Sequence, residues 1–425
     1  MKIKQKWIAV LLCGVMFCTM LTGCGTQAQA LTSNTEVITV NNEEIQQTQT
    51  NILADVSYDM FRNAAAMQKE DVLISPLSAW LVLSMTGQGA NGDTRDAFAQ
   101  FSGNLSAEDQ RILAAWLMEY FTQYAEAEES GVQVGMANSV WCDDAFNVSE
   151  SFVDTAQAYY RAQIIQQNLQ APDAVQNVNR WISDTTDERI QDMLEQIDAS
   201  AVMLLINALT LDAKWQNAFD SANTREDIFY LSDGAEETKE FMHKGLNNAS
   251  YLKWDGGEGI VLPYQSDTNT MSMIALLPDE NHSCDDISNL LSASWLRDVQ
   301  ENCTLATVNL SMPKFKMESS MDLSELCKVM GLEIAFDAQN ADFSGIGEAA
   351  NGSNLFIGRV LQDCMLEVGE EGTKAAAATV VEVRMTSARP DPSLLVNLSF
   401  NRPFVYLVID NETQIPLFTG IYQGE

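Results

Sequence analysis

Few side chains of this sequence could act as a nucleophile, a general base or a metal ligand. His243 and His282 are the only histidines, and neither lies in a catalytic pattern with a serine or a cysteine. Beyond residue 24 there are five cysteines, and their odd number and irregular spacing argue against a disulfide framework and a metal site: Cys142, Cys284, Cys303, Cys327 and Cys364. We therefore expect no enzyme activity, no cofactor and no metal, and we expect both histidines to be structural or to lie on the surface.

The stretch at residues 370–387 has no catalytic groups in a reactive pattern, but it alternates small or apolar residues with charged ones. From Thr373 onward one parity is small or apolar throughout, and its members are Thr373, Ala375, Ala377, Thr379, Val381, Val383 and Met385. The other parity carries every charge, at Lys374, Glu382 and Arg384. This period of two predicts a strand with one buried face, although the alanines at its start favour a helix. Such divided preference suits a segment that changes conformation. An alanine-rich helix or loop leading into an edge strand is the alternative.

The elements that must position this stretch mix helix and strand without an internal repeat. Apolar residues at helical spacing predict helices at residues 51–69, 77–85, 107–128, 150–160 and 175–194, with a further helix starting at Thr94. Apolar runs predict strands at residues 131–141, 202–211, 260–264, 271–278, 306–312, 355–367, 394–400 and 404–410. Because helices dominate the first half and strands the second, the predicted fold class is α+β.

Two of these segments are expected to be buried. Ser75 and Pro76 form a helix-start signal, since a serine side chain can cap a helix and proline suits its first turn. The helix that follows, at residues 77–85, is apolar on nearly every side. The apolar run at residues 202–211 is typical of a central strand covered on both faces.

The composition indicates a strongly acidic globular chain. It has 425 residues, of which 46% are hydrophobic, so it can bury a large core. Its formal net charge is −35, and no basic cluster interrupts the acidic surface. Such a surface repels nucleic acids and anionic membranes, so we expect no nucleic-acid partner.

Residues 1–23 are typical of a targeting segment. Lys2, Lys4 and Lys6 form a basic start, and residues 7–20 form an apolar stretch that is short for a membrane span. The segment ends in Leu21-Thr22-Gly23-Cys24, which resembles the cleavage box of bacterial lipoproteins. That resemblance implies a lipid anchor at Cys24 as the only membrane contact, and an extracytoplasmic protein that is anchored or secreted. An ordinary secretory signal, with Cys24 incidental, is the alternative.

Residues 24–50 are polar and contain few apolar side chains. We expect this segment to be a flexible tether between the anchor and a folded domain at residues 51–425. A strand at residues 36–40 is the alternative for part of it.

The stretch described above carries a resemblance to a known family. Glu370-Glu371-Gly372-Thr373, followed after Lys374 by four alanines and Thr379, resembles the reactive-centre hinge of inhibitory serpins. Other segments resemble serpin motifs in the order in which that family has them: Ile74-Ser75-Pro76-Leu77-Ser78, Asn207-Ala208-Leu209-Thr210-Leu211-Asp212-Ala213-Lys214-Trp215, Leu262-Pro263-Tyr264, Leu276-Leu277-Pro278-Asp279, Met312-Pro313-Lys314-Phe315, Ala335-Phe336-Asp337, Ala341-Asp342-Phe343-Ser344 and Asn401-Arg402-Pro403-Phe404.

The resemblance implies a serpin fold, in which helices pack around a large central β-sheet, with smaller sheets and an exposed reactive-centre loop at about residues 370–393. It assigns to the opening of the sheet Ser75, Pro76, Ser78, Asn207, Trp215 and Gln362. Animal serpins usually have a histidine at the position of Gln362. A glutamine amide can bridge the same backbone groups but cannot titrate near neutral pH.

The resemblance also implies a mechanism, that of a suicide inhibitor of serine or cysteine proteases. The protease forms an acyl complex with the loop, which then inserts into the main sheet with the protease attached; we expect the inhibitor itself to be a monomer. The hinge that must enter comprises Glu370, Gly372, Thr373, Ala375, Ala376, Ala377, Ala378 and Thr379. We expect Gly372 to allow a backbone turn at the hinge. The positions that enter the sheet interior carry no charge and no proline, either of which would stall entry.

The family's nearly fixed distance from the hinge glycine places the reactive bond at Thr386-Ser387. Thr386, preceded by Met385, suits an elastase-like or subtilisin-like protease. Cleavage at Arg384 or Met385 is the alternative. Two other functions stay open: a serpin-fold protein that does not inhibit, acting as a substrate or chaperone, and an extracytoplasmic solute-binding lipoprotein.

Overall fold

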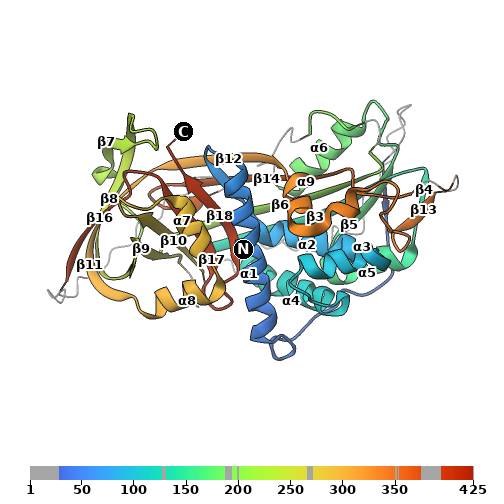
Figure 1. Cartoon of the computed structure of the whole chain (residues 1–425), viewed down its shortest axis with the longest axis horizontal. Coiled ribbons are helices and arrows are strands. Elements are labelled where there is room, and N and C mark those ends of the chain that lie inside the picture. The colour runs from blue at the N-terminus through green and yellow to red at the C-terminus, as the bar shows by residue number, and fades with distance from the viewer. Residues whose placement is uncertain are drawn as a thin grey trace, which may run out of the picture.

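The computed structural model describes residues 28–126, 131–186, 194–198, 201–265, 271–349, 352, 354–374 and 394–424. The predicted α+β class is confirmed, because helices gather mainly in the first half of the chain and strands in the second (Figure 1). The α-helices are α1 (Gln47–Met67), α2 (Pro76–Gly87), α3 (Gly92–Phe101), α4 (Ala107–Glu126), α5 (Glu150–Tyr160), α6 (Ala174–Thr185), α7 (Cys284–Leu290), α8 (Ala293–Glu301) and α9 (Ser324–Cys327).

The main sheet has seven strands within the described residues, in the order β1-β5-β3-β6-β15-β14-β12. Its strands are β1 (Gln29–Leu31), β3 (Val132–Asp143), β5 (Gln163–Gln167), β6 (Met203–Lys214), β12 (Phe315–Asp322), β14 (Arg359–Val368) and β15 (Gly372–Lys374). As predicted from its apolar run, β6 is a central strand, and its first seven residues are all buried.

A second sheet has nine strands in the described part of the chain, and it lies at the other end of the molecule from helices α3 and α5 (Figure 1). Its strands are β2 (Val72–Ile74), β7 (Arg225–Tyr230), β8 (Glu236–Trp254), β9 (Gly257–Pro263), β10 (Met271–Pro278), β11 (Thr304–Pro313), β16 (Leu395–Ser399), β17 (Phe404–Asp410) and β18 (Pro416–Tyr422). Strand β16 is the terminal strand and pairs in parallel with β11. Two short strands, β4 (Phe146–Val148) and β13 (Gly347–Ala349), form a small separate pair.

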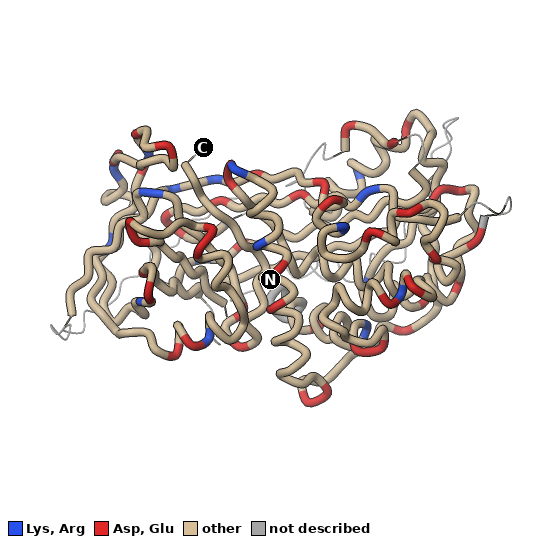
Figure 2. Tube along the Cα trace, viewed as in Figure 1, with Lys and Arg blue, Asp and Glu red and all other residues tan. Residues whose placement is uncertain are grey.

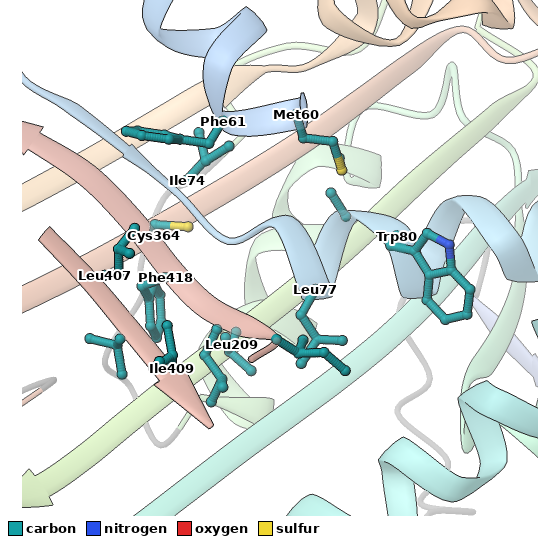
Figure 3. Packing of buried hydrophobic residues seen from close by; sticks show 14 of the residues in the cluster. Met60, Phe61, Ile74, Leu77, Trp80, Leu209, Cys364, Leu407, Ile409 and Phe418 are labelled. Carbon is teal, nitrogen blue, oxygen red and sulfur yellow. The ribbon is translucent and has the colours of Figure 1, made fainter. Parts of the chain in front are cut away.

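Apolar side chains cover both faces of the main sheet. On one face, helices α2 and α4 pack against β6 and β3. On the opposite face, Val178 and Ile182 of α6 form a separate cluster with Ile206 and Leu361. The larger core joins the main sheet to the second sheet, and Figure 3 shows Leu77, Leu209 and Cys364 gathered with residues of β17 and β18. The central strands therefore have no solvent-facing side near their middle.

The segment before α1 differs from the expected tether. Residues 29–31 form β1, which pairs antiparallel with β5 and becomes the edge of the main sheet. The possible strand at residues 36–40 does not form, but Ile38 donates a backbone hydrogen bond to Ala158 and Val40 is buried. The sequence did not predict this packing because the segment is held mainly by backbone and amide hydrogen bonds, which leave no apolar pattern. One example is the bond from the Trp116 indole N–H to the Asn42 side-chain oxygen (2.8 Å).

The chain carries an excess of acidic side chains, and its described cysteines are unpaired. Acidic residues outnumber basic ones over the whole trace (Figure 2). Cys142, Cys284, Cys303, Cys327 and Cys364 are all unpaired, and burial raises the pKa of the thiols of Cys142 and Cys327 to about 12. Such thiols stay protonated and unreactive near neutral pH.

Within the described residues no helix has the length and apolarity needed to cross a membrane.

Candidate functional site: the hinge strand and the gap that holds it

Strands β6 and β14 are paired at one end and separated at the other. Residues 204–208 of β6 pair in parallel with residues 359–363 of β14. Beyond that point β15 lies between them and is antiparallel to both, with Thr373 opposite Ala213 on one side and Val368 on the other. The main sheet is thus closed at its lower end, where β6 and β14 pair directly, and holds the three residues of β15 at its upper end.

Gly372 is required for space rather than for a turn. Its φ angle is not in the positive region that favours glycine, so the turn that we expected at this residue is not the reason for glycine. Instead, a Cβ atom there would overlap the Ala213 carbonyl oxygen and lie 2.8 Å from the Cα atom of Lys214. Both are backbone atoms of β6 and have little room to move. Only glycine lets the hinge strand approach β6 this closely.

Thr373 is the first side chain of the hinge that is inside the sheet. It is 0% exposed, and its hydroxyl group lies 2.6 Å from the Tyr264 hydroxyl oxygen. Trp215 stacks on the Tyr264 ring, with 4.8 Å between centroids and an angle of 11°. The Trp215 indole N–H donates to the Gly369 carbonyl oxygen (2.8 Å), and its backbone N–H donates to that of Glu371 (2.8 Å). Trp215 therefore contacts the turn that leads into β15 through both its indole and its backbone N–H groups.

The Glu370 side chain, in the turn before β15, bonds to residues next to strands of the second sheet. Its carboxylate accepts a hydrogen bond from the Thr224 hydroxyl group (2.8 Å) and lies 3.3 Å from the Lys314 Nζ atom. Partial burial raises the pKa of the Glu370 carboxyl group, but hydrogen bonds from its own backbone N–H and Thr224, with the charge of Lys314, outweigh burial and leave that pKa below its usual range. The ionised form is therefore the one the site favours.

A buried polar group closes the lower end, where β6 and β14 still pair. Gln362 Oε1 accepts a hydrogen bond from the Ser75 backbone N–H (2.9 Å), and Gln362 Nε2 donates to the Ser75 carbonyl oxygen (2.8 Å). The amide thus bridges the backbone groups as its chemistry allows. Beside it in register, Asn207 donates to the Asn138 side-chain oxygen (2.5 Å).

The start of α2 differs in one detail from the expectation. Pro76 occupies the first turn as predicted, and Ser75 is the N-cap residue. However, the Ser75 hydroxyl group makes no capping hydrogen bond; it is buried and, like that of Ser78, has no partner among the described residues. The backbone bonds to Gln362 hold Ser75 instead.

The remaining predicted site residues lie outside the described part of the chain. They are Cys24, Ala375, Ala376, Ala377, Ala378, Thr379, Arg384, Met385, Thr386 and Ser387. Their assigned roles therefore stay predictions. Thr224, Tyr264 and Lys314 also contact the hinge, although the sequence predicted no role for them; the last two lie in the serpin-like motifs quoted above. No local pattern marks them, because their partners are 109, 146 or more than 50 residues away in the chain.

Comparison with known proteins decides the family. The family model described as Serpin (serine protease inhibitor) matches residues 51–423. The chain belongs to the serpin family. Serpin-Z1C of Triticum aestivum is 30% identical over 358 residues, which cover 82% of this chain and 89% of that serpin.

Solved serpin structures confirm the fold. The native state of tengpin, a thermophilic serpin, is 33% identical and has a TM-score of 0.83, covering 94% of this chain and 100% of that chain. The latent state of tengpin gives a TM-score of 0.74 at 31% identity, with 91% and 99% covered. Thyroxine-binding globulin in complex with thyroxine is 20% identical with a TM-score of 0.75, covering 88% and 98%, and this shows the fold alone. The serpin fold predicted from the motifs is confirmed, and the solute-binding alternative is wrong.

Proposed function

We propose that this serpin is a suicide-substrate inhibitor of serine or cysteine proteases that acts by inserting its cleaved reactive loop between β6 and β14. One observation supports this most directly: β15 already lies antiparallel between these strands, in the direction that a longer inserted strand must follow. The residues that would follow Thr373 into the sheet interior have small or apolar side chains and no proline. Entry therefore meets neither a buried charge nor a missing hydrogen-bond donor.

The energetics favour insertion once the loop is cut. A further inserted strand adds about ten backbone hydrogen bonds at roughly 1 kcal/mol each. It also replaces the parallel β6–β14 pair by two antiparallel pairs, which are slightly more stable per residue. This gain is comparable to the whole stability of a domain, roughly 5–15 kcal/mol. The uncleaved form is then metastable and persists because of a kinetic barrier.

For the reactive bond we propose Thr386-Ser387, and for the target an elastase-like or subtilisin-like protease with a small or medium apolar pocket. The test mixes the serpin with elastase, subtilisin and trypsin, followed by denaturing gels and mass spectrometry of the new N-terminus. We expect a complex with elastase or subtilisin that survives denaturation, and cleavage after Thr386. Thr386→Arg should transfer complex formation to trypsin, whereas the control Arg384→Ala should leave the elastase complex unchanged.

The same experiment distinguishes the alternative of a serpin-fold protein that does not inhibit. Such a protein would be cut cleanly by each protease without a denaturation-resistant complex. That result for all three enzymes would remove the inhibitory proposal for these targets. A complex with cleavage after Arg384 would keep the mechanism but move the reactive bond.

We further propose that the chain is exported as a lipoprotein and anchored through Cys24. The support is the basic start, the short apolar stretch and the four residues Leu21-Thr22-Gly23-Cys24. Two or more acyl chains give lasting membrane attachment where one does not. In a bacterial host, the native chain should fractionate with membranes and Cys24→Ser should not. Equal membrane fractions for both would contradict the anchor and leave an ordinary secretory signal.

A further inference from the structure

Asp363 occupies the position where the main sheet begins to part. It is the last residue of β14 that pairs with β6, opposite Ala208. On its other side it lies opposite Ser320 of β12. In its present register, β15 can lengthen by more than three residues only if Asp363 separates from Ala208. The environment of this carboxyl group therefore changes in the step that opens the sheet.

The carboxyl group of Asp363 is poorly compensated. Its Oδ1 atom is buried and has no hydrogen-bond partner among the described residues. Its strand parity puts it on the same face as Leu361, which packs with Val178 and Ile182 of α6. Burial raises the pKa of the Asp363 carboxyl group to about 6, and a hydrogen bond with Ser320 opposes this only in part.

No nearby cation compensates this carboxylate in the part of the chain that the structure describes. The only basic residue of β14, Arg359, donates to the Asp322 carboxylate (2.9 Å). The charged residues on the same face of β14, β12 and β6, together with the exposed ones of α6, are Arg359, Glu367, Lys316, Glu318, Asp322, Asp212, Lys214, Arg180 and Asp184. Lys316 is paired with Glu318, and none of these charged groups contributes to the shift of the Asp363 pKa.

We propose that Asp363 makes opening of the main sheet pH-dependent, the neutral carboxylic acid permitting strand insertion and the carboxylate opposing it. This rests on the proposed insertion mechanism and concerns its regulation. Extending the register of Glu367 with Lys374 puts Ala378 beside Asp363 in the inserted state. A methyl group offers the carboxylate neither a hydrogen bond nor a countercharge, so its desolvation is not offset. Gln362, the adjacent residue, cannot titrate, and Asp363 supplies a titrating group in its place.

The sign of the effect follows from linkage. A group whose proton is bound more tightly in the inserted state favours insertion as the pH falls. If only the neutral form inserts, its population rises by up to about 25-fold between pH 7.5 and pH 5.5 for a carboxyl group that titrates near pH 6. The rate of insertion should rise by the same factor at most.

The test uses the full folded serpin and a synthetic peptide with the sequence of residues 373–386 as the probe. Native gels and thermal unfolding follow the peptide-bound species at pH 5.5, 6.5 and 7.5. The native chain should insert the peptide up to about 25-fold faster at pH 5.5 than at pH 7.5. Asp363→Asn, and Asp363→Ser as a second variant, should be fast at every pH. The control Glu318→Gln removes an exposed carboxylate on the same face and should keep the pH dependence.

Two results would overturn the proposal in different ways. A rate that is independent of pH in the native chain, or an unchanged pH dependence in both Asp363 variants, would remove the role of Asp363 alone. No insertion of the peptide by any variant at any pH would instead contradict the insertion mechanism and the role of Asp363 with it. Circular dichroism of each variant shows that it is folded before the rates are compared.

Discussion

If this serpin inhibits as proposed, Gly372→Ala is expected to convert it from an inhibitor into a substrate. The added Cβ atom would overlap the Ala213 carbonyl oxygen and crowd the Cα atom of Lys214, so β15 must leave its place against β6. Overpacking of this kind destabilises by about 1–3 kcal/mol. The same overlap would meet the hinge after cleavage, so insertion would slow while hydrolysis of the acyl ester would not. We expect the yield of denaturation-resistant complex to fall by at least about tenfold.

The chain offers a matched control for this variant. Gly369 lies three residues earlier in the same turn, and a Cβ atom there would meet nothing within 4 Å. Gly369→Ala should therefore form complex as the native chain does. The measurement is the number of inhibitor molecules consumed per protease molecule inactivated, with cleaved inhibitor quantified on gels. Efficient complex formation by Gly372→Ala would contradict the requirement for close approach.

Glu370→Lys is expected to release the hinge and accelerate spontaneous conversion to inserted or polymeric forms. The substitution places a second ammonium group near that of Lys314 and leaves the Thr224 hydroxyl group without its acceptor. Losing a hydrogen-bonded charged partner costs about 1.5–3 kcal/mol, which corresponds to a rate increase of at least about tenfold if the contact is absent in the transition state. Native gels of the purified serpin incubated at 37 °C would follow the loss of monomer.

A charge exchange tests whether the pair itself is responsible. Glu370→Lys combined with Lys314→Glu should recover part of the lost kinetic stability, since the two variants affect the same contact. The recovery is partial because Lys314 also lies 3.7 Å from Glu240, and the exchange removes that ion pair. Because the pKa of Glu370 is below its usual range, its stabilising contact is fully present above the ordinary carboxyl pKa of about 4.3 and is lost as the pH falls below it. Equal conversion rates for the native chain and Glu370→Lys at pH 7 would show that the contact does not restrain the hinge.

Local patterns predicted much of the fold. The boundaries of α5, β10 and β17 were predicted to the residue, because each is a strongly periodic or apolar run between clear turn residues. The central position of β6 followed from its unbroken apolar run. The structure differs for β8, a strand of 19 residues whose first five residues are polar and mostly exposed, so its start lacks the apolar signal of a strand. Helix α8 was missed as well; Ser292 caps it, but it buries only Ala293 and Leu296.

The site was predictable only where its residues are neighbours in the sequence. The hinge carries its own signal in the alternation from Thr373 onward. The contacts that hold it do not, since Tyr264 and Thr224 meet the hinge only through the folded sheets. The reason for Gly372 could not be read from the sequence either, because a turn and a close approach of two strands both require glycine. Tertiary packing decided between them.

The residues that flank positions 375–393 belong to different sheets. A strand could insert from a cut chain or from an intact chain, and this arrangement makes the two cases differ. Lys374 ends β15 in the main sheet, whereas residue 395 begins β16, which pairs along five residues with β11 in the second sheet. A cut within the loop frees the hinge side while β16 stays in place. An intact chain can insert a strand of the same length only if β16 separates from β11. This breaks backbone hydrogen bonds of roughly 1 kcal/mol each. In the proposed mechanism, the connection of the loop to β16 therefore keeps an uncut chain from inserting, and cleavage removes this constraint.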